Sequence, residues 1–284
     1  MLYYVMKMLS KLVCLLPYKS INYIGDIIGG LTWYLVPKKR KQMAKQNIML
    51  ALDKNEATAE IIAKKSWTRF GAMIMEVLYF PKIKQDINKY VEIQGREYLD
   101  EALKQGKGIV LATAHSGNWE LLGGGLALNG YQIVGVAQKQ TNGSMDKFIN
   151  EYRRVIGMDI AYKNSVRDMV RFLSEKKIVG LLMDQDADKN GVIVNFFGRK
   201  ASTPQGPAVL ARMSGSPIVP MFITKRSDGL YKIIIHKHID AQNTADKKND
   251  ILNDITNLTK IIEDHIRIYP KEWFWLHNRW QVKD

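Results

Sequence analysis

The sequence predicts an α/β fold in which helices flank a mixed, largely parallel central sheet, preceded by an N-terminal helical segment that associates with a membrane. Two observations predict the sheet. Short runs rich in β-branched residues recur from about residue 90 onward, and segments able to form helices separate them. The N-terminal segment is predicted because an apolar stretch is followed at once by a cluster of cations.

The first 80 residues are predicted to form a helical, membrane-associating region. In residues 2–16 the few polar or small side chains recur at helical spacing, which leaves the rest of that helix apolar. We expect this stretch to remain in the mature protein, because no basic region precedes it and no small-residue cleavage site follows it. The stretch between Pro17 and Pro37 is borderline for a membrane span, so a shallowly inserted helical pair is an equal alternative.

Cations cluster directly after this apolar stretch, at Lys38, Lys39, Arg40, Lys41 and Lys45. Such a cluster is attracted by the negatively charged cytoplasmic leaflet of a membrane. The alternative is that residues 1–36 are helices buried against an ordinary core. Apolar spacing then predicts one more helix from residue 56 to residue 80.

Residues 81–284 are predicted to form one α/β domain, because no repeat or low-complexity linker interrupts them. Each predicted strand is a short apolar run, and each predicted helix lies between two such runs. The predicted strands are 90–93, 109–114, 131–137, 159–162, 178–183, 218–224 and 231–239, the helices between them are 96–105, 119–128, 144–156 and 166–176, and 247–268 forms a closing helix.

The net charge of +14 implies an anionic partner, which could be nucleic acid, an acidic protein or an anionic lipid surface. A nucleic-acid-binding protein should interleave its cations with stacking aromatic residues. Here the densest cationic run adjoins the apolar N-terminus, which favours a membrane surface. The single cysteine excludes an intrachain disulfide. We expect no metal site, because His236 and His238 alternate on a strand without a third ligand.

One segment, residues 109–120, combines the features of a catalytic site. An apolar strand leads into His115, turn residues follow, and a helix begins near Trp119. Ligands of open α/β sheets bind at this end of the strands. Glu120, in the first helical turn, can fold back so that its carboxylate holds one ring nitrogen while the other takes a proton from an alcohol. The alternative is a histidine that is only hydrogen-bonded in place and an acid that complements the helix dipole.

Several further motifs follow residues 109–120 along the chain, and their order and spacing are distinctive. After His115 and Glu120 come Arg153, Asp184-Gln185-Asp186, Phe196-Phe197-Gly198, Thr203, Gly206, Leu210-Ala211-Arg212 and the run from Trp273 to Trp280. In this order the chain resembles, over essentially its whole length, the late acyltransferases of lipid A biosynthesis. These belong to a broader superfamily that acylates lysophospholipids and glycerol phosphate. His115 and Glu120 match the His-x4-Asp/Glu signature of that superfamily.

The resemblance implies O-acyl transfer from a thioester to a hydroxyl of a phosphorylated glycolipid, with a lipid A precursor as the first choice. The donor it implies is acyl carrier protein, with acyl-coenzyme A as the alternative, and no cofactor is expected. The implied location is the cytoplasmic face of the inner membrane. Another glycolipid or a lysophospholipid is the alternative acceptor, and a basic nucleic-acid-binding protein is the alternative of a different class. The basic charge suits both an acidic carrier protein and a phosphorylated lipid.

By the same resemblance, Arg153 is expected to hold a phosphate or to steady an oxyanion. Thr203 and Pro204 are predicted as the N-cap and first position of a helix whose free N–H groups hold a phosphate. Relatives often carry an arginine just after the third strand, where this chain has Lys139 between two glutamines. Residues 273–280 are expected either to pack the tail or to lie at the lipid interface.

Two more groups of substrate-binding residues are predicted. Phe196 and Phe197, followed by Gly198 in a long loop, suit the wall of an acyl-chain pocket, although they could be simple core. Asp184 and Asp186 follow a strand and either contact the substrate or cap the next loop.

Overall fold

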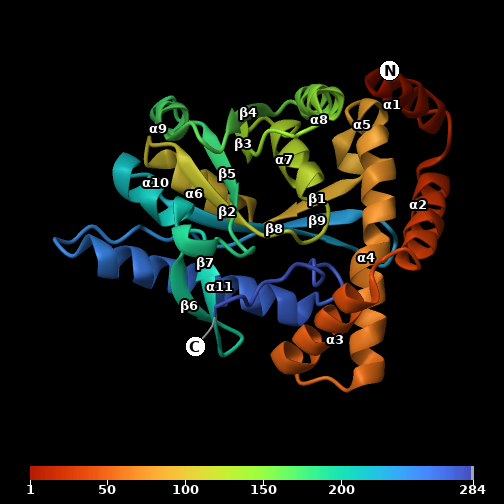
Figure 1. Cartoon of the computed structure of the whole chain (residues 1–284). Coiled ribbons are helices and arrows are strands. Elements are labelled where there is room, and N and C mark those ends of the chain that lie inside the picture. The colour runs from red at the N-terminus through yellow and green to blue at the C-terminus, as the bar shows by residue number, and fades with distance from the viewer. Residues whose placement is uncertain (283–284) are drawn as a thin grey trace.

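The structure, a computed structural model, describes residues 1–282, so the last two residues of the predicted α/β domain lie outside it. Figure 1 shows a central sheet with helices on both faces and a helical N-terminal region beside it. The strands are β1 (Val91–Gln94), β2 (Ile109–Thr113), β3 (Ile133–Ala137), β4 (Asp159–Tyr162), β5 (Ile178–Leu182), β6 (Val192–Phe196), β7 (Arg199–Thr203), β8 (Ile218–Lys225) and β9 (Tyr231–Ile235).

The helices of the N-terminal region are α1 (Leu2–Val13), α2 (Tyr18–Trp33), α3 (Lys38–Leu52) and α4 (Glu56–Leu78). The rest of the chain contributes α5 (Phe80–Ile83), α6 (Arg96–Lys104), α7 (Trp119–Ala127), α8 (Gly143–Val155), α9 (Val166–Ser174), α10 (Gly206–Ser214) and α11 (Lys247–Ile268), with short 3-10 turns η1 (Ile87–Lys89) and η2 (Asp188–Asn190).

Within the described residues the main sheet has seven strands in the order β1-β9-β8-β2-β5-β3-β4, and β6 and β7 form a separate hairpin. Neighbouring strands of the main sheet run parallel except β8 and β9, which are antiparallel. The predicted mixed, largely parallel sheet flanked by helices is therefore confirmed. Each of the seven predicted strand segments forms a strand of this sheet.

The central strand β2 shows why the sheet is covered on both faces. All five of its residues are buried. Val110 and Ala112 belong to a core shared with α9, α10 and α11, whereas Ile109 and Leu111 belong to a core shared with α6, α7 and α8. Because side chains alternate between the faces of a strand, a strand covered on both faces reads as one continuous apolar run.

Close backbone contact joins α2 to α4, which stands beside the sheet in Figure 1 with α2 on its outer side. Gly25 and Gly29 of α2 face Gly71 of α4, and no side chain separates the two backbones. A Cβ atom on Gly29 would lie 2.1 Å from the carbonyl oxygen of Thr68. The spacing of these two α2 glycines therefore serves helix packing.

Replacing Gly29 by alanine is expected to lower the free energy of unfolding by about 1–3 kcal/mol, because the added methyl group meets backbone atoms that have no room to move. Gly30 is the matched control. A Cβ atom there meets nothing within 4 Å, and alanine is the better helix former, so Gly30→Ala should leave stability equal or raised. Denaturant unfolding of both variants gives the comparison, and equal stability would contradict close packing at Gly29.

The N-terminal helices leave many large apolar side chains exposed. Among residues 1–282, no helix has both the length and the apolar character that crossing a bilayer requires. The exposed side chains, called here the N-terminal apolar set, are Leu2, Tyr4, Val5, Met8, Leu9, Leu12, Leu15, Leu16, Tyr23, Ile27, Ile28, Leu31, Tyr34 and Leu35. Membrane association of this region stays a prediction.

The chain between β5 and α10 differs from the expectation of a long loop. Residues 192–203 form the β6–β7 hairpin, which packs against α11. The prediction that Thr203 caps a helix is wrong, because Thr203 is the last residue of β7 and α10 begins three residues later. Gln205 occupies the N-cap position of α10, and Pro207 lies in its first turn. A proline does stand where the helix starts, but it is Pro207 and not Pro204.

Candidate active site

His115 lies just beyond the carboxyl end of β2, in a turn that several contacts hold in place. Gly117 has a φ of +61°, and a Cβ atom there would lie 2.1 Å from the carbonyl oxygen of Ile223. Asn118 caps α7 by accepting a hydrogen bond from the Leu121 amide at 3.0 Å. From α4, Arg69 donates to the carbonyl oxygens of His115 at 3.1 Å and Gly117 at 2.6 Å. The histidine is therefore fixed through its backbone.

The imidazole of His115 is paired with Asp184. Its Nδ1 lies 2.8 Å from Oδ1 of Asp184, and the indole N–H of Trp273 donates to Oδ2 of the same carboxylate at 2.7 Å. Burial alone would raise the pKa of this carboxyl group, whose side chain is 1% exposed, but the His115 ring and the Trp273 indole lower the pKa below its usual value. An ionised Asp184 accepts a hydrogen bond from the Nδ1–H group and leaves Nε2 of His115 available for proton transfer.

Sheet register explains this pair. Thr113 of β2 lies opposite Leu182 of β5, and His115 and Asp184 follow two residues later on each strand. Parallel neighbours end at the same edge, so their continuing side chains meet there.

Glu120 does not contact the imidazole as the sequence predicted. Its two carboxylate oxygens accept from Nε and Nη2 of Arg153, at 2.8 Å and 2.6 Å. The guanidinium group of Arg153, which lies on α8, offers two parallel N–H donors that match the two oxygens of the carboxylate. The two groups therefore form a strong bidentate pair. Although burial would lower the pKa of Arg153, the hydrogen bonds and charge of Glu120 raise it above its usual value. Arg153 also donates to Oδ1 of Asn150 at 3.2 Å.

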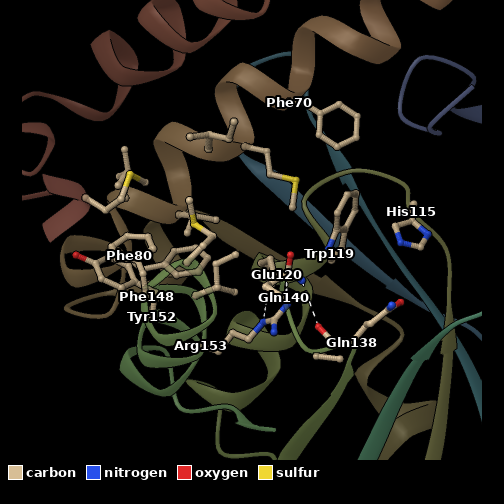
Figure 2. A pocket seen from close by; sticks show the side chains of 18 of the residues that line it. Phe70, Phe80, His115, Trp119, Glu120, Gln138, Gln140, Phe148, Tyr152 and Arg153 are labelled. Atoms are coloured by element: carbon tan, nitrogen blue, oxygen red, sulfur yellow. Dashed lines mark hydrogen bonds and ion pairs between the residues drawn. The ribbon is translucent and has the colours of Figure 1, made fainter. Parts of the chain in front are cut away.

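His115 and the Glu120–Arg153 pair face one cavity of about 530 Å³, large enough for a small-molecule ligand. Figure 2 shows His115 at one end, Glu120 and Arg153 in the middle, and Phe80, Phe148 and Tyr152 grouped at the far end. The lining is mostly apolar. It consists of Met6, Phe70, Met73, Ile74, Val77, Leu78, Phe80, His115, Trp119, Glu120, Val136, Ala137, Gln138, Gln140, Met145, Phe148, Ile149, Tyr152, Arg153 and Leu182.

The far end of the cavity is reached by α1. Met6 lines it, and the residues on either side of Met6 anchor α1 to α8. The Tyr3 hydroxyl donates to Glu151 at 2.5 Å, and the Lys7 ammonium group pairs with the same carboxylate at 2.6 Å. The first helix is thus part of the cavity wall.

The predicted residues Phe196, Phe197, Gly198 and Thr203 lie outside the lining of this cavity. Phe196 is 1% exposed and its ring packs against Trp273, with 5.6 Å between ring centroids. Phe197 and Gly198 form the turn between β6 and β7, both with positive φ. The hydroxyl of Thr203 accepts a hydrogen bond from the buried Arg279. Their assignment as substrate contacts stays a prediction.

Asp186 also lies outside the cavity lining and holds the C-terminal segment. Its backbone amide donates to Nε2 of His277 at 3.0 Å, and its Oδ2 accepts from Gln281 at 3.0 Å. Within residues 1–282 the structure has no group of three or more His, Cys, Asp or Glu side chains arranged to hold a metal ion. Of the predicted site residues, the cavity brings together His115, Glu120 and Arg153, with Asp184 directly behind the imidazole.

Arg69 is a site residue that the sequence did not single out, and the role of Trp273 was not predicted. The expectation that residues 273–280 either pack the tail or lie at the lipid interface did not assign Trp273 a polar partner. Trp273 is in fact 1% exposed and holds Asp184, while the amide of Phe274 donates to the His115 carbonyl at 3.1 Å. A buried indole usually finds a partner for its N–H group, which is the only sequence signal that could have indicated this role.

Replacing Trp273 by phenylalanine is expected to lower the turnover of the enzyme by about tenfold, because Asp184 loses one of its two hydrogen bonds and orients the imidazole less well. The matched control is Trp275→Phe. That indole is equally buried but donates to the Pro270 carbonyl at 2.7 Å, so its loss should affect stability and leave the pH profile of turnover unchanged. Equal losses of turnover in the two variants, with unshifted pH profiles of turnover, would show that Trp273 acts through packing alone.

Comparison with known proteins shows the family of the chain. A family model described as bacterial lipid A biosynthesis acyltransferase matches residues 1–282. The lipid A biosynthesis lauroyltransferase of Escherichia coli K12 is 26% identical over 287 residues, covering 96% of this chain and 89% of that protein. The phosphatidylinositol mannoside acyltransferase of Mycolicibacterium smegmatis is 26% identical over 203 residues, which cover 68% of this chain.

The chain spans less than two thirds of the mannoside acyltransferases it matches, 64% of the Mycolicibacterium protein and 59% of one from Mycobacterium tuberculosis H37Rv. Among solved structures, the 1-acyl-sn-glycerophosphate acyltransferase of Thermotoga maritima is similar with a TM-score of 0.40 and 12% identity. That similarity covers 89% of this chain and 99% of the other.

Proposed function

Because the chain belongs to the bacterial lipid A biosynthesis acyltransferase family, we propose that it transfers a fatty acyl group from a thioester to a hydroxyl of a phosphorylated glycolipid. One observation carries the proposal. The His115 imidazole, held by the buried Asp184, opens onto a mostly apolar cavity. The proposed donor is acyl carrier protein or coenzyme A, and the first acceptor is a lipid A precursor.

In the proposed reaction, Nε2 of His115 removes the proton of the acceptor hydroxyl while the hydroxyl oxygen attacks the thioester carbonyl carbon. A C–O bond forms, the C–S bond breaks, and the departing thiolate takes the proton back from the imidazolium. Asp184 stabilises the imidazolium and fixes the ring orientation. Arg153 supplies positive charge beside the reacting carbonyl, and Glu120 sets the position of Arg153.

We propose that the acyl chain lies in the cavity that runs from His115 toward Met6. Apolar side chains line most of this path, among them Met73, Val77 and Phe148. Burying hydrocarbon against them removes apolar surface from water and is favourable at about 25 cal/mol per Å². The charged groups of the cavity, Glu120 and Arg153, are paired with each other, so neither is left as an unpaired charge against an alkyl chain.

A second acceptor class is a glycolipid of the phosphatidylinositol mannoside kind, because relatives with that name match two thirds of the chain. A lysophospholipid acceptor remains the alternative within the superfamily. The nucleic-acid-binding alternative has no support, since the named relatives are acyltransferases.

The direct test is turnover by the purified protein. It is supplied with acyl carrier protein or coenzyme A thioesters and, separately, with a lipid A precursor, a phosphatidylinositol mannoside and a lysophospholipid. Mass spectrometry should detect an ester product that gains one acyl chain. If neither donor supports acylation of any of the three acceptors, the proposal is overturned.

We further propose that the N-terminal apolar set and the nearby cations bind the cytoplasmic surface of the inner membrane peripherally. Changing Leu12 and Leu31, which are 54% and 64% exposed, to aspartate together is expected to weaken binding to anionic vesicles by about tenfold or more. Vesicle sedimentation measures the change. The control is Ile268→Asp, an equally exposed apolar residue at the end of α11. Unchanged binding of the double variant would refute the proposal.

A further inference from the structure

A second cavity, of about 580 Å³, lies where α2 ends and α3 begins. It is bounded by the last turn of α2, the start of α3, one side of α4 and the C-terminal segment. Its lining consists of Thr32, Leu35, Val36, Pro37, Arg40, Trp67, Phe274, Leu276 and His277. Nothing in the reaction described above uses this cavity.

An aromatic wall separates the two cavities. Phe70, which lines the first cavity, packs against Phe274 and Trp67, which line the second, with ring centroids 4.9 Å and 6.1 Å apart. The amide of Phe274 also donates to the carbonyl oxygen of His115. A ligand in the second cavity would therefore contact Phe274, the residue whose amide holds the His115 backbone.

The chemistry of this cavity suits a lipid with a negatively charged group. Among its described lining residues, none is acidic and most are apolar. Arg40 is the cation of the lining and donates to the Leu276 carbonyl at 3.4 Å. Burial lowers the pKa of His277, whose Nε2 already accepts from the Asp186 amide, so this ring stays neutral near pH 7. Lys39 and Lys41 add positive charge beside the cavity without lining it.

We propose that this second cavity binds the acceptor lipid, with hydrocarbon against Val36, Trp67 and Leu276 and a phosphate on Arg40. The charge favours an anionic ligand, and the exposed apolar residues Leu31, Tyr34 and Leu35 give it a continuous path from a membrane surface. The assignment as acceptor rests on the proposed acyltransferase function, whereas binding of an anionic lipid here does not.

The first experiment measures binding without turnover. The full chain is illuminated with lysophosphatidylglycerol that carries a photoreactive diazirine near the end of its acyl chain, and labelled residues are mapped by mass spectrometry. Labels are expected on Val36, Trp67 or Leu276, and the zwitterionic lysophosphatidylcholine analogue should label them less. Arg40→Gln should reduce this labelling about fivefold, the effect of one cation at a phosphate.

Lys39→Gln is the matched control, because it removes the same charge from the neighbouring residue outside the cavity lining. It should change the labelling by less than about twofold. Two outcomes would overturn the proposed lipid site and indicate general attraction to the lipid surface. One is an equal loss of labelling in the Arg40 and Lys39 variants, and the other is labelling confined to Leu12 and Leu31 of the N-terminal apolar set.

The second experiment separates the acceptor from bulk membrane lipid. With a glycolipid that the wild-type protein acylates, Arg40→Gln should raise the KM for that acceptor about fivefold and leave the KM for the acyl donor unchanged. An unchanged acceptor KM, with photolabelling still dependent on Arg40, would overturn the acceptor assignment. Absence of turnover by the wild-type protein would instead count against the proposed function and leave the labelling result as it stands.

Discussion

Replacing His115 by glutamine is expected to lower the rate of acyl transfer by roughly a hundredfold to ten-thousandfold, the range that a general base contributes. Glutamine has similar length and can still donate a hydrogen bond to Asp184, but it cannot take a proton from the acceptor hydroxyl. The KM for the acyl donor should change little, because the apolar side chains of the cavity proposed to bind the acyl chain are untouched. Steady-state kinetics with a single acceptor measures both quantities.

The control for this change is His238→Gln. His238 lies after β9 and its ring contacts Gln105 at the surface, so the same substitution there should leave turnover unchanged. Circular dichroism and thermal unfolding show whether each variant keeps its fold. A folded His115→Gln variant that turns over at nearly the wild-type rate would rule out His115 as the base.

Replacing Asp184 by asparagine is expected to lower turnover by roughly ten-thousandfold, an effect of the size known for the orienting aspartate of a Ser-His-Asp triad. The amide removes the negative charge that stabilises the imidazolium and permits the wrong tautomer of His115. Because the charge next to the ring is lost, the pH profile of turnover should also change. Rate measurements across a range of pH give both the size of the loss and the shift.

Glu120→Gln is the comparison that decides which carboxylate orients His115. In the structure Glu120 pairs with Arg153, so its substitution should reduce turnover through Arg153 and leave the pH profile unshifted. The sequence alone predicted the opposite assignment, with Glu120 on the imidazole. A shifted pH profile for Glu120→Gln, together with an unshifted one for Asp184→Asn, would restore that prediction.

The sheet could be predicted from the sequence because its central strands β2 and β8 are buried on both faces. Strand β2 has five buried residues in a row, and β5 and β8 carry similar apolar runs. Such runs, bounded by turn residues and separated by amphipathic helices, leave few other folds open. The closing helix α11 shows the same principle, since its observed bounds, 247–268, equal the predicted ones.

The partner of His115 could not be read from the sequence in the same way. Spacing along the chain favoured Glu120, five residues away, whereas Asp184 is 69 residues away and meets the ring only through the pairing of β2 with β5. Strand order is a property of the whole sheet, and no local pattern encodes it. Arg153 then takes the carboxylate of Glu120, a contact 33 residues apart that depends on how α8 packs beside α7.

One helix and two strands were not predicted as separate elements because their local patterns are weak. Helix α3 is rich in cations and has few buried residues, so its sequence resembles a solvated basic stretch. Strands β6 and β7 combine exposed polar residues with a few buried ones, and the Phe197-Gly198 turn between them gives no standard hairpin signal. The misplaced N-cap at Thr203 has the same origin, since two prolines three residues apart offer two plausible helix starts.

Met6 is contributed by a helix that precedes the whole α/β domain, whereas His115, Asp184 and Arg153 belong to the domain itself. The depth available to a hydrocarbon chain is consequently set by where α1 rests on α8, through Tyr3 and Lys7 at Glu151. Sliding that helix by one turn, about 5.4 Å, would deepen or shorten the cavity while every reacting group stayed in place. Under the proposed function, chain-length preference and chemical competence are therefore separable, and changes in the residues of α1 alone are expected to alter the first.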